Sequence, residues 1–131
     1  MNRYTAMKIV VIVALGAALT GVGSDYIRKQ MEPTTQVPGG DVSRAKQEIQ
    51  MYGCGSCHEI PGVPAAHGAV GPPLSGMGKR AYVAGKLPNE PDNLIYWIQQ
   101  PQAVWPGNAM PNLGVTDRDA RDIAAYLYTL K

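Results

Sequence analysis

The segment "YGCGSCHEIPG", residues 52–62, holds the residues whose types and spacing could do chemistry. It brings Cys54, Cys57 and His58 into one short stretch, and the chain has no other cysteine. Thiols and an imidazole this close together suit a disulfide, part of a zinc site, a redox dithiol or the attachment point of a cofactor.

Three of these four interpretations fit the sequence poorly. A disulfide between Cys54 and Cys57 would close too small a loop to constrain much of the chain. A tetrahedral zinc ion needs four ligands, and the two cysteines with one of the two histidines leave no obvious fourth. A thioredoxin-like dithiol requires a βαβ pattern, which the sequence does not show.

The fourth interpretation is haem, because C-x-x-C-H is the attachment signature of a c-type haem. Two sulfur atoms at this spacing can form thioethers with the two vinyl groups on one edge of a porphyrin. The imidazole of His58 can then reach the iron from the same turn. We therefore predict one haem c, bound covalently through Cys54 and Cys57, with His58 as the proximal iron ligand. The haem would also enlarge a core that contains no phenylalanine and only three short helices.

The residues alone leave two candidates for the sixth iron ligand. Met77 lies in the loop "LSGMGKR", and Met110 lies further along in "GNAMPNLG", where the longer separation lets the chain reach the opposite haem face. We assign Met51 to packing of the first helix and His67 to a solvated loop. A thioether ligand favours Fe(II), and two protein ligands leave no room for a small-molecule substrate at the iron.

The sequence predicts an all-α haem domain over residues 42–131. Apolar residues recur at helical spacing in three segments, "DVSRAKQEIQMYGC", "PDNLIYWIQQP" and "TDRDARDIAAYLYTLK". In the last of these, Thr116 and Asp119 resemble a capping box, and further acids crowd the first turn. Gly/Pro-rich loops separate the helices, and no window alternates as a strand does. Residues 30–41, "QMEPTTQVPGGD", are a predicted flexible linker.

In residues 1–29, Arg3 and Lys8 precede an apolar run from Ile9 to Gly23. The run spans about 22 Å, short of the ~30 Å hydrocarbon core, whereas residues 4–27 span about 36 Å. We interpret the segment as an N-terminal transmembrane helix; a secretory signal cleaved near "GVGS" is the competing interpretation. Both place the haem domain on the periplasmic or outer face of a bacterial inner membrane.

The haem domain is formally neutral. Acidic and basic residues are equal in number from Asp41 onwards, so the net charge of +2 belongs to residues 1–40. A neutral domain without a basic stripe argues against nucleic-acid binding. It also implies weak charge steering, which a membrane tether can replace by keeping the domain close to its partners.

With "CGSCH", "GPPLSGMGKR", "NAMPNLG" and "DIAAYLYTL", residues 42–131 resemble a class I (monohaem) cytochrome c. The tract 85–127 is similar to cytochrome c domains associated with haem–copper terminal oxidases. The resemblance implies the small cytochrome c fold, in which helices and loops wrap round one haem. It also implies roles for individual residues: iron ligation by His58 and Met110, a Pro72 carbonyl beside His58, Arg80 near a haem propionate, and Trp97 against the macrocycle.

The resemblance implies an electron-transfer protein rather than an enzyme. It would carry single electrons between a quinol-oxidising complex or dehydrogenase and a terminal oxidase, either as a tethered carrier or as a subunit of such a complex. The alternative is a haem-based redox enzyme or gas sensor with a labile sixth ligand.

Overall fold

The computed structural model describes residues 37–131. The anchor predicted at residues 1–29 and the linker residues 30–36 lie outside this part. Within residues 37–131, every helix is too short or too polar to span a bilayer. The elements follow one another as helix α2 (Val42–Met51), 3-10 turns η1 (Cys54–Ser56) and η2 (Met77–Lys79), strands β1 (Tyr82–Val83) and β2 (Leu87–Pro88), and helices α3 (Pro91–Gln99), α4 (Pro101–Val104) and α5 (Asp117–Thr129).

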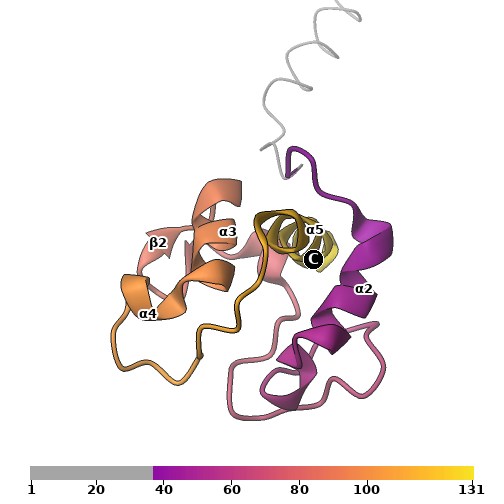
Figure 1. Cartoon of the computed structure of the whole chain (residues 1–131), viewed down its shortest axis with the longest axis horizontal. Coiled ribbons are helices and arrows are strands. Elements are labelled where there is room, and N and C mark those ends of the chain that lie inside the picture. The colour runs from indigo at the N-terminus through magenta and orange to yellow at the C-terminus, as the bar shows by residue number, and fades with distance from the viewer. Residues whose placement is uncertain (1–36) are drawn as a thin grey trace, which may run out of the picture. The chain divides into compact units, whose positions relative to one another are not determined.

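Helix α5 lies between α2 and α3, and both helices pack against it (Figure 1). Its N-terminus has the expected cap, since Thr116 Oγ1 accepts a hydrogen bond from the backbone N–H of Asp119 at 3.2 Å. From Ala120 to Tyr128 only Arg121 is not buried. The last helix is therefore the centre of the core.

Helix α2 also starts as the sequence predicts. The carboxylate of Asp41 accepts a hydrogen bond from the backbone N–H of Ser43 at 2.9 Å and so caps the helix. Ala45 and Ile49, one turn apart, are fully buried. Gly53 then takes a left-handed conformation, with φ of 69°, which ends the helix directly before the cysteines.

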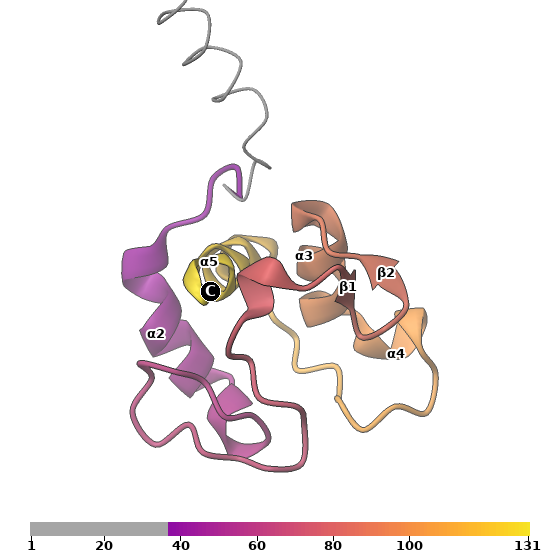
Figure 2. The ribbon, with the colours of Figure 1, turned by 180° about the vertical axis from the view of Figure 1, so that it is seen from behind.

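Helix α4 and the two strands differ from the sequence prediction. Pro101 ends α3 but also begins α4, because the first position of a helix needs no N–H donor. Strands β1 and β2 form an antiparallel hairpin with Val83 opposite Leu87, beside α3 and α4 (Figure 2). The described domain is therefore mostly helical rather than strictly all-α. Strands of two residues are too short to show an alternating pattern in the sequence.

The described end of the predicted linker packs onto α5. Val37 is only 6% exposed and belongs to the core. Gly40 approaches α5 so closely that a Cβ there would lie 2.6 Å from the carbonyl oxygen of Arg121. The packed part of the chain consequently begins before α2.

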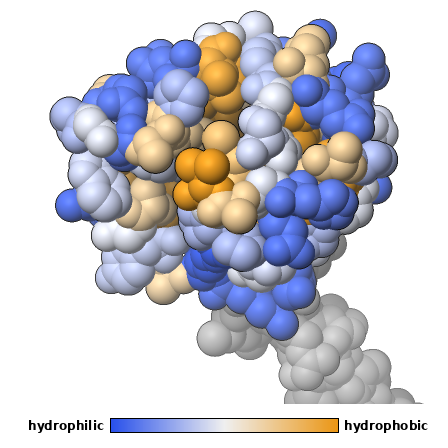
Figure 3. All heavy atoms as spheres, turned by 90° about the horizontal axis from the view of Figure 1, so that it is seen from below, coloured by the Kyte–Doolittle hydropathy of each residue, from blue (hydrophilic) through white to orange (hydrophobic). Residues whose placement is uncertain are grey.

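Apolar side chains reach the surface on one side of the domain. Seen from the side on which loops 59–75 and 105–115 lie, they gather near the centre of the face, with hydrophilic residues around them (Figure 3). The core is thus not closed on this side by the polypeptide alone.

Tyr126 provides a test of how α5 holds loop 59–75. Its hydroxyl donates a hydrogen bond to the carbonyl oxygen of Pro61 at 2.6 Å. Tyr126→Phe leaves this carbonyl unpartnered and should lower the free energy of unfolding by about 1–2 kcal/mol, measured by denaturant titration of the haem-containing protein. Tyr96→Phe removes a hydroxyl from an exposed side chain and should cost less than about 0.5 kcal/mol. Equal effects of the two changes would contradict this account.

Candidate functional site

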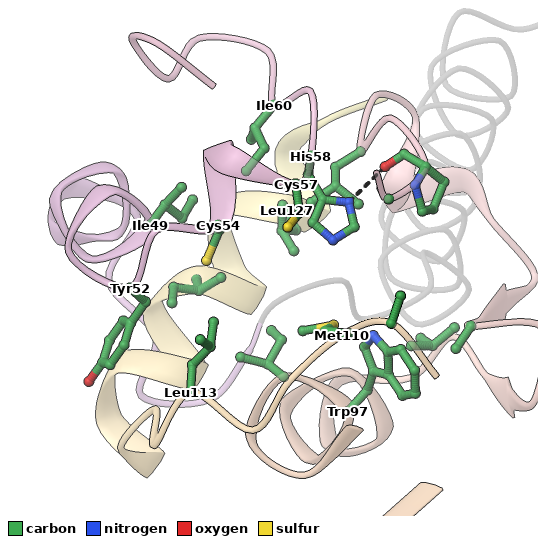
Figure 4. Close-up of a pocket in the computed structure, with 18 of the residues that line it drawn as sticks. Ile49, Tyr52, Cys54, Cys57, His58, Ile60, Trp97, Met110, Leu113 and Leu127 are labelled. Atoms are coloured by element: carbon green, nitrogen blue, oxygen red, sulfur yellow. Dashed lines mark hydrogen bonds between the residues drawn. The ribbon is translucent and has the colours of Figure 1, made fainter. Parts of the chain in front are cut away.

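A pocket of about 490 Å³ lies among α2, η1, α3, α5 and the two long loops (Figure 4). Its volume falls within the range of about 300–1,000 Å³ typical of ligand and cofactor pockets. Apolar side chains from three helices form much of its wall, among them Ile49, Leu94 and Leu127. The lining also includes the sulfur-bearing side chains of Cys54, Cys57 and Met110 and the imidazole of His58.

The turn after α2 directs both thiols and the imidazole to the pocket (Figure 4). The backbone N–H groups of Cys57 and His58 both donate to the carbonyl oxygen of Cys54, at 3.2 and 3.0 Å, which winds the motif tightly. The two cysteines are not joined to each other. Burial raises the pKa of the Cys54 thiol, whereas a reactive dithiol needs a stabilised thiolate. The structure therefore also disfavours the dithiol interpretation.

The imidazole of His58 is held by a backbone carbonyl. Its Nδ1 lies 2.8 Å from the carbonyl oxygen of Pro72, so Nδ1 carries the donated proton and Nε2 is free to bind a metal. Gly71 makes this approach possible, because a Cβ there would lie 2.6 Å from Nδ1 of His58. The backbone N–H of Gly71 in turn donates to the carbonyl oxygen of Cys57 at 2.8 Å.

Glycines let loop 59–75 lie directly on the motif. The backbone N–H of Gly68 donates to the carbonyl oxygen of Gly55 at 3.0 Å, and a side chain at Gly68 would collide with the backbone of Ser56. No role for Gly68 or Gly71 was predicted from the sequence. The signal that could have found them is the close glycine spacing in "AHGAVGPPL", directly after the haem motif.

Met110 enters the pocket from the side opposite His58 (Figure 4). Its loop is held by two amide side chains that the sequence analysis missed. Asn108 Oδ1 accepts a hydrogen bond from the backbone N–H of Met110 at 2.7 Å. Gln102, on the unexpected helix α4, donates from Nε2 to the carbonyl oxygens of Met110 and Asn108, each at 2.8 Å. Helix α4 thus positions the Met110 loop.

The structure places the other candidate ligands differently. Met77 also lines the pocket, but it is 4% exposed and belongs to the core. Met51 is 65% exposed and outside the lining, so its assignment to helix packing was wrong. His67 is exposed and also outside the lining, as expected for a loop histidine. Among residues 37–131, Met110 and Met77 are therefore the methionines that line the pocket.

Trp97 and Arg80 are both in the pocket lining, and Trp97 lies next to Met110 (Figure 4). The guanidinium of Arg80 donates to the carbonyl oxygens of Pro73 and Ser75. Arg80 therefore holds the end of loop 59–75, directly after Pro72, whose carbonyl oxygen accepts the hydrogen bond from His58. Its approach to a haem propionate stays a prediction.

Three large apolar side chains of the pocket lining are exposed: Val70, Trp105 and Leu113. The ammonium group of Lys86 lies over Trp105, 4.6 Å from the centroid of its ring. This cation–π contact ties the β1–β2 hairpin to the loop that carries Met110.

The residues of this pocket fit the haem that the motif predicts. Two thiols stand beside an imidazole with a free Nε2, and a thioether faces them across the pocket. Apolar walls suit a flat macrocycle, and Arg80 offers a cation for an acidic edge group.

Comparison with known proteins agrees with this geometry. The family model described as Cytochrome c matches residues 42–131. Cytochrome c oxidase subunit 2 of Alkalihalophilus pseudofirmus is 33% identical over 101 residues, which cover 76% of this chain and 28% of the relative. Cytochrome c oxidase subunit 2 of Bacillus sp. (strain PS3) is 26% identical over 110 residues, or 81% of this chain and 31% of the relative. The chain thus spans less than a third of the length of these relatives. No solved structure matches.

Gly71 offers a direct test of the site. Gly71→Ala forces a methyl group against the His58 ring, so it should lower the free energy of unfolding by about 1–3 kcal/mol and disturb the iron–histidine spectrum. Denaturant titration and visible absorption of the haem-containing protein measure the two effects. Ala69→Ser adds one atom at an exposed position of the same loop and should leave both nearly unchanged. A Gly71→Ala protein with the spectrum of the unmodified chain would contradict the proposed packing.

Proposed function

The chain belongs to the cytochrome c family, and on this basis we propose that it is a one-electron carrier of a respiratory chain that serves a haem–copper terminal oxidase. Its haem c is held through Cys54 and Cys57 of the C-x-x-C motif. The proposal rests on one observation: these cysteines and His58 line the same pocket as Met110, which faces them across it.

The residues that would ligate the haem iron have defined parts in this proposal. When bound, the haem supplies an iron that gains and loses one electron. His58, oriented by the Pro72 carbonyl, is the proximal ligand, and Met110 is the distal ligand. A soft thioether donor stabilises Fe(II) and so raises the reduction potential. With a protein side chain on each side, no position is left for a substrate, which favours electron transfer over catalysis.

Two observations support a terminal oxidase as the electron acceptor. Both relatives are cytochrome c oxidase subunits 2, and each shares a region of similar sequence with this chain. The domain is neutral, and its pocket lining includes exposed apolar side chains, which suits short-range contact with a partner already close by.

The proposal extends to the place of the protein in the cell. Residues 1–29 act as a membrane anchor, and the haem domain lies on the periplasmic face of a bacterial inner membrane. The electron donor is a quinol-oxidising complex or a dehydrogenase. The chain works either as a tethered carrier or as a fixed subunit, and copurification after gentle detergent extraction distinguishes the two.

Substitution of methionines tests the distal ligand. Met110→Ala should abolish the red charge-transfer band of ferric methionine-ligated haem and lower the reduction potential, because a soft ligand is lost. Visible spectroscopy and redox titration measure both. Met51→Ala changes an exposed methionine and should alter neither. An unchanged band in Met110→Ala together with its loss in Met77→Ala would transfer the role of distal ligand to Met77.

Oxidation by a terminal oxidase tests the function itself. The ferrous full-length protein, mixed with membranes that contain a haem–copper oxidase, should be oxidised by oxygen in a reaction that cyanide stops. Membranes without such an oxidase are the control. If the ferrous protein instead binds carbon monoxide rapidly and is oxidised without the membranes, the alternative of a gas sensor or redox enzyme is favoured.

A further inference from the structure

A second polar cluster lies where α2 packs against α5. Glu48 comes from α2, and Asp119 and Asp122 come from α5; their exposures are 5%, 3% and 0%. One carboxylate oxygen of each residue lies within 4.8 Å of those of the other two. Three carboxylates this close in a buried place repel one another unless other groups compensate their charge.

Two arginines compensate part of this charge. Arg44 contacts both carboxylate oxygens of Asp122, with Nε 2.8 Å from Oδ2 and Nη2 3.0 Å from Oδ1. Arg118 contacts Asp119 Oδ1 through Nη2 at 2.7 Å and Nε at 2.9 Å. The hydroxyl of Tyr52 donates to the other oxygen of Asp119 at 2.7 Å. Arg44 also contacts the carboxylate of Asp41 at 2.7 Å, so the two guanidinium groups leave at least one negative charge uncompensated.

The uncompensated group is Glu48. Its Oε1 lies 4.0 Å from the nearest nitrogen of Arg44 and of Arg118, too far for a hydrogen bond. Its Oε2 is buried and has no hydrogen-bond partner among residues 37–131. By contrast, both oxygens of Asp119 and of Asp122 accept hydrogen bonds, and Asp122 Oδ1 also accepts one from the backbone N–H of Asp41 at 2.6 Å.

We propose that Glu48 is a buried proton-binding site: in mildly acidic solution its carboxyl group carries one proton, which removes one excess negative charge from the cluster and gives the unpartnered oxygen a proton to donate. A metal ion is a poorer occupant, because arginine, tyrosine and backbone donors already occupy the oxygens of both aspartates.

The surroundings of Glu48 favour its neutral form. Burial is the main cause that raises the pKa of Glu48 to about 7, followed by the charges of Asp122 and Asp119 and by the hydrogen bond that only the protonated acid could donate to Asp122; Arg118 opposes the shift. Arg44 is the other charge facing Glu48, and it is engaged by Asp122 and by Asp41. Tyr52, directly after α2, is a further titratable group at the cluster, through its hydrogen bond to Asp119.

The proton makes the contact between α2 and α5 sensitive to pH. An unfolded glutamate has a pKa near 4.3, so folding takes up a proton between that pH and the folded value. The stability that the neutral carboxyl contributes is fully present below pH ~4.3 and is lost as the pH rises through about 7. Tyr52 lines the haem pocket and bonds to Asp119, so the cluster adjoins the haem site.

The pH dependence of unfolding tests the proposal in the haem-containing full chain. Between about pH 5 and 7 the unfolding equilibrium constant of the unmodified protein should rise with pH by a factor that approaches tenfold per pH unit. The constant of Glu48→Gln should lack this rise, because its amide imitates the protonated acid. Glu90→Gln makes the same substitution at an exposed position and should follow the unmodified protein. Identical pH profiles for Glu48→Gln and the unmodified chain would overturn the proposal.

Infrared spectroscopy gives a second readout that does not depend on the variant folding. The unmodified protein at pH 6 should show the carbonyl stretch of a buried carboxylic acid, which disappears by pH 9; a folded Glu48→Gln protein should lack it. Absence of this band at pH 6 would overturn the proposal. Stoichiometric calorimetric binding of added calcium chloride would also overturn it, and would identify the cluster as a cation site. Neither outcome bears on the electron-carrier function.

Discussion

The hydrogen bond between His58 Nδ1 and the Pro72 carbonyl is the contact on which the haem site depends most directly. It fixes both the orientation of the ring and the nitrogen that remains free for iron. The bond can form only because Gly71 has no side chain and because the N–H of Gly71 is anchored on Cys57. The cysteine turn and loop 59–75 therefore behave as one interlocked unit, in which a change in the loop alters the position of the ligand.

Haem completes the core that the helices leave open. Helices α2, α3 and α5 each turn an apolar side chain to the pocket, and loops rather than further helices close its rim. A domain of this size buries a limited fraction of its surface, so apolar walls facing water would weaken it. A covalently held macrocycle covers these walls and cannot dissociate from them. The same group thus serves both folding and electron transfer.

The sequence predicted those parts of the structure that depend on neighbouring residues. The C-x-x-C-H motif, the three main helices and the cap at Thr116 are all local patterns, and all are present. Long-range contacts were not predictable in the same way. The roles of Gln102 and Gly71 depend on which distant groups lie against them, the Met110 loop and the His58 ring, and a single sequence does not show this. Asp119 was expected only as part of a helix cap, whereas it is also buried against Tyr52 of the first helix.

Helix α5 combines two kinds of contact on two of its faces. Ile123 and Leu127 face the haem pocket, where apolar packing is favourable but imposes little orientation on the helix. Asp119 and Asp122 face α2, where hydrogen bonds to Tyr52 and Arg44 have defined lengths and angles. Because the polar contacts tolerate little rotation or sliding, they fix how α5 lies on α2. The apolar face, with Ile123 and Leu127, is then held in the pocket wall.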